Sequence, residues 1–143
     1  RKTRLVGDGH KTDTPSSITY SSVESRDSVR IGLMLASLND LDIAVCDIGN
    51  AYLNADCREK LWTIAGPEFG SDRGSIMLIV RALYGFKSSG AAWRAKLAET
   101  LSSMNYKSCE ADPDVWMKEE KKPNGESYYA YILVYVDDIF IIQ

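Results

Sequence analysis

Histidine and paired cysteine are scarce in this sequence, which limits the metal chemistry that it can carry. His10 is the single histidine, and the three cysteines, Cys46, Cys57 and Cys109, form no CxxC pair. This set is a poor match to structural zinc sites, which combine four Cys and His ligands. We therefore expect three reduced thiols and no zinc site.

Long apolar runs are also missing. No stretch reaches the roughly 20 apolar residues that a membrane-spanning helix requires, and the opening "RKTRLVGDGHK" lacks the apolar segment of a secretory signal. We expect a soluble, intracellular chain with no membrane partner. The 143 residues, 45% of them hydrophobic, suit one globular core. Because the chain starts without Met and stops at Gln143 directly after an apolar run, we expect a fragment of something longer.

A basic excess is missing as well. The formal net charge of −3 gives no global electrostatic argument for nucleic-acid binding. The N-terminal basic residues Lys2, Arg4 and Lys11 fit either a solvated tail or a phosphate contact.

Two helices are predicted after an extended, polar entry over residues 1–21. Ser25 can cap a helix that runs to Asp40, with Asp27 in its first turn. The apolar side of this helix is predicted to hold Val29, Leu33, Met34 and Ala36. A second helix follows "YGFKSSG" and ends at Asn105, with an apolar stripe of Trp93, Leu97, Leu101 and Met104.

Strand patterns fill most of the remaining chain. "LDIAVCDI" alternates, and its apolar face ends in the carboxylate of Asp47. "KLWTIA" and "SIMLIVRAL" predict a hairpin with a long loop, and two further strands flank the turn around Pro123–Gly125. Strands and helices without regular alternation favour an α+β fold with a largely antiparallel sheet.

Adjacent carboxylates stand between two apolar runs in "YAYILVYVDDIFIIQ". Asp137 and Asp138 are placed where a hairpin should turn, and aspartate is common in exposed turns. They could equally hold a divalent metal, because two like charges beside apolar strands are costly unless a cation compensates. Mg²⁺, a hard ion that takes one or two carboxylates and substrate phosphates, is the natural candidate.

A third acid strengthens the metal interpretation. Asp47 ends its own strand, which could neighbour the Asp137 hairpin, although a strand-end acid can also simply face water. Three converging carboxylates would suit two-metal phosphoryl transfer, either nucleotidyl transfer or phosphoester hydrolysis. Hydrolysis would usually need further ligands such as histidine, which the sequence hardly offers.

Two nearby segments offer weaker signals. Tyr52, five residues after Asp47, could lie beneath the sugar of a nucleotide or be a core tyrosine. In "RALYGFKSSGAAW", small residues at a helix entrance with Arg81 and Lys87 could receive phosphate oxygens, or could be ordinary capping residues.

In order and spacing, "RLV", "DIGNAYLNA", "RALYGFKSSGAAW", "ADPDVW" and "YVDD" resemble the reverse transcriptase of copia-type (Pseudoviridae-like) long-terminal-repeat retrotransposons. The resemblance runs from about Lys2 to the end of the chain. It implies a truncated polymerase palm, a ferredoxin-like antiparallel sheet packed on helices, with part of the fingers. Residues 1–143 would form this single fingers and palm fragment, without thumb, connection or RNase H.

The resemblance also implies the site. Asp47, Asp137 and Asp138 would form the catalytic triad and bind two Mg²⁺ ions, for which Mn²⁺ could substitute, with Asp47 and Asp137 as principal ligands. The Ile48 carbonyl would help to hold the nucleotide-side metal. Tyr52 would be the steric gate that favours dNTPs over ribonucleotides.

Further contacts follow from the same resemblance. The incoming nucleotide and the template would pack against Tyr84, Gly85, Phe86 and Lys87. The primer terminus would lie beside Tyr135 and Val136, and Arg4, with Lys2, would contact the triphosphate. The expected partners are an RNA or DNA template with its primer, dNTPs, and the rest of a polyprotein (thumb, RNase H, integrase), in cytoplasmic virus-like particles or the nucleus.

Departures from the family pattern keep a second hypothesis open. The chain has Gly7 and Asp8 after "RLV", and Ser88 and Gly90 where the family usually carries Gln and Pro. Asp8 in particular weakens the phosphate contact implied for this segment. A degenerate or domesticated remnant that binds nucleic acid or a protein partner without catalysis is the alternative, and as an isolated chain we expect little processive activity.

Overall fold

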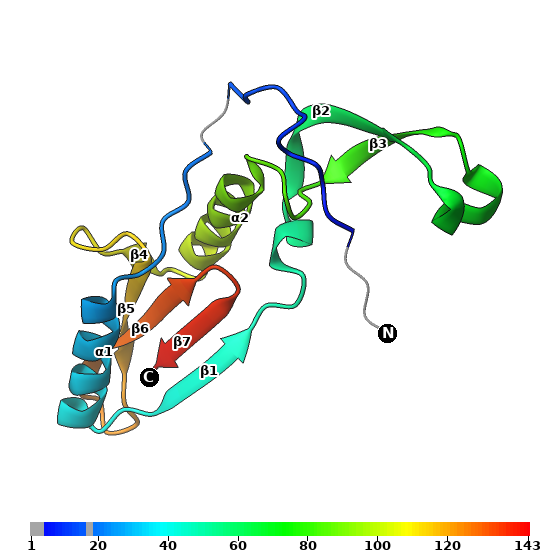
Figure 1. Ribbon diagram of the computed structural model, residues 1–143. Helices are drawn as coiled ribbons and strands as arrows, with labels where there is room; N and C mark the ends of the chain where they lie inside the picture. Colours follow the sequence, from blue (N-terminus) through cyan, green and yellow to red (C-terminus); the bar gives the residue numbers. More distant parts are fainter. Residues whose placement is uncertain (1–4, 17–18) are drawn as a thin grey trace. The chain divides into compact units, whose positions relative to one another are not determined.

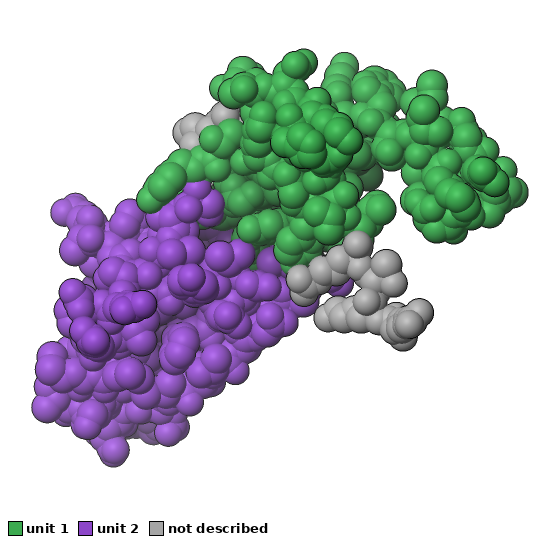
Figure 2. Space-filling view, viewed as in Figure 1, with its two compact units in different colours: residues 1–20, 52–96 green, residues 21–51, 97–143 purple. Residues whose placement is uncertain are grey.

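The computed structural model describes residues 5–16 and 19–143 (Figure 1). Arg4 and Lys2, with their implied triphosphate contact, lie outside the described residues. The chain divides into two compact units, each built from two separate segments (Figure 2). Unit 1 comprises Arg1–Tyr20 and Tyr52–Lys96, and unit 2 comprises Ser21–Ala51 and Leu97–Gln143. That residues 1–143 form one fingers and palm fragment stays a prediction.

Unit 2 is built on a five-stranded sheet in the order β1-β7-β6-β5-β4, in which every neighbouring pair is antiparallel. This confirms the predicted mixture of helices with a largely antiparallel sheet. The strands are β1 Ile43–Asp47, β4 Lys107–Ser108, β5 Val115–Lys121, β6 Ser127–Tyr135 and β7 Asp138–Ile142. The short β4 was not predicted from the sequence.

Helix α1, Arg26–Asn39, confirms the first predicted helix. The Ser25 side chain accepts a hydrogen bond from the backbone N–H of Ser28, which caps the helix start. Asp40 ends the helix in the left-handed conformation, and its N–H donates to the Ala36 carbonyl.

The predicted apolar side of α1 is partly wrong. Leu33 and Met34 are exposed, whereas Gly32 and Ala36 are buried. Gly32 faces the sheet at close range, since a Cβ there would lie only 3.0 Å from a methyl carbon of Ile142. The missing side chain lets α1 approach the sheet closely, and the core forms from Ala36, Leu133 and Ile142.

Unit 1 contains the predicted hairpin. Strands β2, Asp56–Ile64, and β3, Ile76–Arg81, pair antiparallel, with a bulge between Asp56 and Leu61. The connection includes the short helix η2, Pro67–Asp72. A second short helix, η1, Ala51–Asn54, lies between β1 and β2 and was not predicted.

The N-terminal segment docks on the "YGFK" loop within unit 1. Gly7 N–H donates to the Tyr84 carbonyl at 2.6 Å, and Val6 pairs with Tyr84 in a parallel bridge. Gly85 has φ of +93°, and a Cβ there would lie 2.1 Å from the Gly7 carbonyl oxygen. Only glycine fits this position, since both its conformation and the space exclude a side chain.

Helix α2, Ser89–Ser103, confirms the second predicted helix, with its first half in unit 1 and the rest in unit 2. Trp93, Leu97 and Leu101 are buried as predicted. Met104 is half exposed, because it lies beyond the last helical turn, and the left-handed Asn105 turns the chain. Among the described residues, neither helix is long and apolar enough to cross a membrane.

Candidate functional site

Two of the three predicted acids meet in the register of β1 and β7. The two strands pair antiparallel, and Asp47 lies directly opposite Asp138 at the end of the ladder. Directly opposed residues send their side chains to the same face of a sheet. Both aspartates are exposed, so their carboxylates share one solvent-facing end of the unit 2 sheet.

The third acid lies in the turn between β6 and β7. Tyr135 pairs with Asp138, which leaves Val136 and Asp137 as a two-residue turn. The prediction that both aspartates make the turn is therefore half right, because Asp138 already begins β7. Ile48 N–H donates to the Asp137 carbonyl at 2.7 Å, which ties the end of β1 to this turn.

Backbone strain marks the same turn. Val136 has φ of +58°, in the left-handed region that β-branched residues strongly avoid. The turn of the preceding hairpin, between β5 and β6, instead places Gly125 at positive φ. The chain thus holds a valine in an unfavourable conformation beside its carboxylates, and strained residues of this kind often occur at functional sites.

The carboxylate pair fits a hard divalent cation. Like charges directly opposite each other destabilise a sheet, and a cation shared between them would offset that repulsion. In the described part of the chain, no group of three or more Asp, Glu, His or Cys side chains is arranged to hold a metal. Two carboxylates are nevertheless enough for Mg²⁺, which commonly completes its shell with water and substrate phosphates.

A buried carboxyl that was not predicted lies beside this end of the sheet. Glu24 is 8% exposed, and its backbone N–H donates to the Val134 carbonyl of β6. Burial raises the pKa of Glu24, and the negative charges of Asp112, Asp114 and Asp138 raise it further. The sequence offers no signal for Glu24, because a glutamate just before a helix cap is normally solvated.

Asp112 anchors the start of α1. Its carboxylate accepts hydrogen bonds from Ser28 Oγ at 2.5 Å and from Ser25 N–H at 3.0 Å. Burial alone would raise the pKa of Asp112, but these bonds together with one from Asp114 N–H lower it below its ordinary value. Asp112 belongs to the motif "ADPDVW", which contributed to the family resemblance but did not indicate this structural role.

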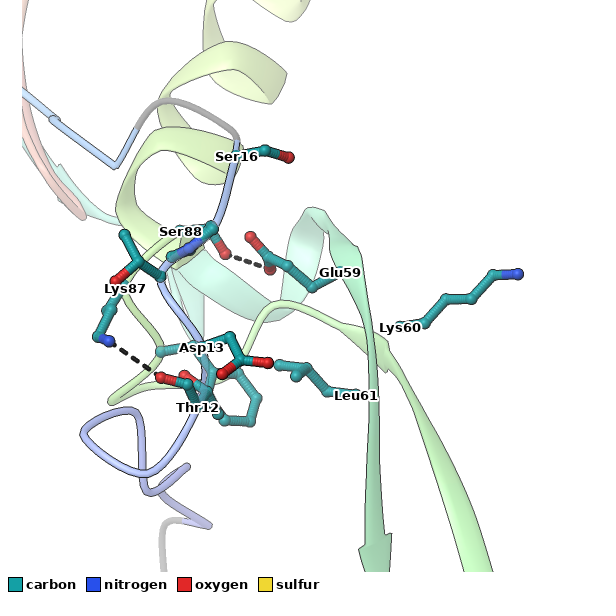
Figure 3. A pocket seen from close by; sticks show the side chains of 11 residues that line it. Thr12, Asp13, Ser16, Glu59, Lys60, Leu61, Lys87 and Ser88 are labelled. Carbon is teal, nitrogen blue, oxygen red and sulfur yellow. Dashed lines mark hydrogen bonds between the residues drawn. The ribbon is translucent and has the colours of Figure 1, made fainter.

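The predicted nucleotide-binding residues of the central segments gather in unit 1. The rings of Tyr52 and Tyr84 lie 4.6 Å apart between centroids, at 33° to each other. Gly85 follows in the tight contact with Gly7 described above, and Phe86 lines a pocket of about 270 Å³ together with Lys87 (Figure 3). The segment therefore forms one structured loop, in which Tyr84 supports the ring of Tyr52.

This pocket is lined by polar groups from three segments. Lys87 Nζ donates to the Thr12 carbonyl at 3.0 Å, and Ser88 Oγ donates to Glu59 at 2.5 Å (Figure 3). Lys87 thus fastens the N-terminal segment to the loop while its side chain stays exposed. Glu59 was missed by sequence analysis, since a charged residue on an alternating strand normally faces water.

Charge is divided unevenly between the two units. Unit 1 contains eleven Lys and Arg against six Asp and Glu, a formal charge of +5. Unit 2 contains six against fourteen, a formal charge of −8, and it holds the three predicted catalytic acids. The overall value of −3 hides a basic unit suited to phosphates and an acidic unit suited to cations.

Comparison with known proteins gives a consistent answer. The family model described as reverse transcriptase (RNA-dependent DNA polymerase) matches residues 1–143. The chain is 28% identical, over 99% of its length, to the retrovirus-related Pol polyprotein from transposon TNT 1-94 of Nicotiana tabacum. It is 30% identical over 98% to that from transposon RE1 of Arabidopsis thaliana, and 34% identical over 76% to the transposon Ty1-BL Gag-Pol polyprotein of Saccharomyces cerevisiae.

These relatives are much longer than the chain, which spans 11%, 10% and 6% of them respectively. No solved structure gives a significant match. The resemblance to copia-type elements that was drawn from the motifs is confirmed.

Proposed function

The chain belongs to the reverse transcriptase (RNA-dependent DNA polymerase) family, and from this premise we propose that it is the catalytic core of an RNA-directed DNA polymerase. It would act within a longer Pol polyprotein, extending a primer on an RNA or DNA template with dNTPs. The observation that carries the proposal is the register of β1 and β7, which sets Asp47 opposite Asp138 with Asp137 one residue away in the turn.

The carboxylates would supply the ligand oxygens for Mg²⁺. Asp47 and Asp138 share one face of the sheet, and Asp137 would add a third carboxylate from the turn. When bound, two Mg²⁺ ions supply activation of the primer 3′-hydroxyl and neutralisation of phosphate charge. The hydrogen bond from Ile48 N–H to the Asp137 carbonyl would keep the end of β1 and the turn in fixed register, which is the preorganisation that such a site needs.

The remaining site residues would select and position substrates. Tyr135 precedes the turn and pairs with Asp138, so it would lie beside the primer terminus together with Val136. Tyr52, supported by the ring of Tyr84, would limit the space beneath the sugar of the incoming nucleotide. Lys87 would contribute positive charge near the phosphates.

Primer extension by a polyprotein that contains this chain tests the proposal. Asp47→Asn, Asp137→Asn and Asp138→Asn remove one negative ligand each and should each abolish extension with Mg²⁺ and dNTPs. Asp27→Asn is the matched control, because Asp27 is an exposed acid of α1 that pairs with Arg30. Near-normal extension by the Asp47 variant, with circular dichroism unchanged, would refute the assignment.

Sugar selection gives a separate test. Tyr52→Val should admit ribonucleotides, because the smaller side chain leaves room for a 2′-hydroxyl, and the ratio of dNTP to rNTP incorporation measures it. Tyr129→Val, an exposed tyrosine of β6, is the control. If the wild-type polyprotein bound template and primer but did not extend the primer, a non-catalytic remnant would be the better description.

A further inference from the structure

The end of β6 that leads into the carboxylate turn is held through both backbone groups of Val134. Its N–H donates to the Asp114 carbonyl at 3.0 Å, and its carbonyl accepts from the Glu24 N–H at 3.3 Å. Val134 is buried and stands directly before Tyr135, which pairs with Asp138 across the turn. The segments around Glu24 and Asp114 therefore fix the base of the hairpin on which the carboxylates lie.

Asp112 joins these two segments through a single side chain. Its Oδ2 atom accepts from Ser25 N–H at 3.0 Å and from Ser28 Oγ at 2.5 Å, and its Oδ1 atom accepts from Asp114 N–H at 3.2 Å. Ser25 follows Glu24 directly, so one carboxylate binds beside each of the two groups that hold β6. These bonds keep the pKa of Asp112 below its ordinary value, and the carboxylate is therefore charged at neutral pH.

The bonds at this point differ from those of an ordinary antiparallel ladder, in which two opposed residues can exchange both of their N–H···O bonds. Val134 N–H donates to Asp114 in the ladder manner. The Asp114 N–H, however, donates to the side chain of Asp112. The Val134 carbonyl accepts from Glu24. The segment before α1 thus joins the sheet at the end of β6, and the Asp112 carboxylate takes part in the junction on both sides.

Capping of α1 does not account for all of these bonds. The Ser25 side chain already accepts from Ser28 N–H, which is the usual cap bond. Asp114 lies outside the helix, directly before β5, and a helix cap needs no bond to it. The bonds of Asp112 as a set connect the start of the helix with the entry to β5, and both of these border the end of β6.

We propose that Asp112 is a positioning residue, which holds the end of β6 and thereby the turn that carries Asp137 and leads into Asp138. This role rests on the proposed polymerase function, in which these carboxylates and Asp47 bind Mg²⁺. Without Asp112 every metal ligand would remain, but the turn would be held less firmly and Asp138 would be less well placed opposite Asp47. Cations should then bind more weakly, since partners outside the ligand shell fix the orientation of the ligands.

Amide hydrogen exchange of the 143-residue chain tests the link without any catalysis. Asp112→Ala should speed exchange at the Val134 and Glu24 amides at least about ten-fold, the scale of hydrogen bonds lost to a charged group. The amide of Ala130, farther along the same strand, should change less. Gly125→Val is the matched control, because it strains the turn at the other end of β6 and should show the reverse pattern.

Primer extension over a range of Mg²⁺ concentrations tests the effect on the carboxylates. In a polyprotein that contains this chain, Asp112→Ala should raise the half-saturating Mg²⁺ concentration about ten-fold, the low end of the effect of residues that orient metal ligands. Excess Mg²⁺ should restore much of the rate. Asp112→Asn keeps one acceptor oxygen and should lie between the wild type and Asp112→Ala. Gly125→Val should leave the Mg²⁺ dependence unchanged, as should Glu110→Ala, at an exposed acid of the same loop.

Two outcomes would overturn the proposal. If exchange at Val134 and Glu24 in Asp112→Ala changes no more than at Ala130, Asp112 does not hold the end of β6. If Asp112→Ala lowers the rate equally at every Mg²⁺ concentration, as a loss of folded protein would, its role is not positional. A wild-type polyprotein that extends no primer would refute the proposed function, whereas the exchange result would still decide whether Asp112 holds the turn.

Discussion

Glu24 is buried beside the carboxylate end of the sheet, and in the described structure its Oε2 atom accepts no hydrogen bond. Because its pKa is higher in the folded than in the unfolded chain, the folded chain holds the proton more tightly. The contribution of Glu24 to stability should then be greatest below the ordinary value of 4.5 and should be lost as the pH rises through the raised pKa. At neutral pH the ionised Glu24 carboxylate therefore lowers the free energy of unfolding.

Glu24→Gln removes this penalty. We expect an increase in the free energy of unfolding on the order of 1 kcal/mol at pH 7, because the neutral amide avoids the cost of burying a charge, and almost none in acid. Chemical denaturation across this pH range measures the difference. Glu110→Gln, at an exposed position, should show no such trend. A gain that is equal at every pH would mean that charge is not its cause.

Other residues of the site were accessible to sequence reasoning because they belong to motifs with fixed spacing. Asp47, Asp137 and Asp138 were identified in this way, although the direct pairing of Asp47 with Asp138 required the register of the sheet. Glu24 and Glu59 were not accessible. Their burial and bonding depend on segments distant in sequence, and neither stands in a pattern that distinguishes it from a solvated glutamate.

At the scale of elements, the two hairpins that share β6 differ in the residue that adopts positive φ in the turn. The β5–β6 turn uses Gly125 at φ +86°, whereas the β6–β7 turn uses Val136 at φ +58°. Left-handed conformation costs a side-chain-bearing residue about 1–2 kcal/mol, and glycine loses about 0.5–1 kcal/mol through its greater freedom in the unfolded chain. The valine turn is therefore the weaker one.

Val136→Gly should stabilise the chain by up to about 1 kcal/mol, and Gly125→Val should destabilise it. Urea denaturation of both variants measures the changes against the same wild type. The paired design separates turn strain from any general effect of glycine in a hairpin. A loss of stability in Val136→Gly would show that packing of the valine side chain outweighs the strain of its backbone.

The elements themselves were largely predictable, because caps, turn residues and alternation are local signals. Ser25 and Asp40 bound α1 as predicted, and β2 and β3 pair as the predicted hairpin. Burial was less predictable. Leu33 and Met34 face outward, and the side of α1 that holds Gly32 and Ala36 packs against the sheet, which periodicity alone cannot reveal.

At the scale of the whole molecule, charge is the property that the sequence average conceals. A net charge of −3 argues against nucleic-acid binding, yet the described residues, in interleaved segments, carry +2 in unit 1 and −8 in unit 2. Phosphates should therefore be attracted to unit 1 and repelled by unit 2 away from bound cations. Nucleic-acid binding by this chain should depend on the unit in which a Lys or Arg side chain lies, and not on the net charge of the whole chain.

Salt dependence of oligonucleotide binding tests this distribution. Each phosphate contact contributes a slope of about −0.7 for single strands in a plot of log affinity against log salt concentration. Lys87→Gln, in unit 1, should weaken binding and make the slope shallower by about that amount. Lys107→Gln and Lys121→Gln remove exposed cations of unit 2 and should leave the slope unchanged, although they change the net charge equally. Equal slopes for all three variants would mean that binding responds to overall charge, and the division between the units would then have no role in recognition.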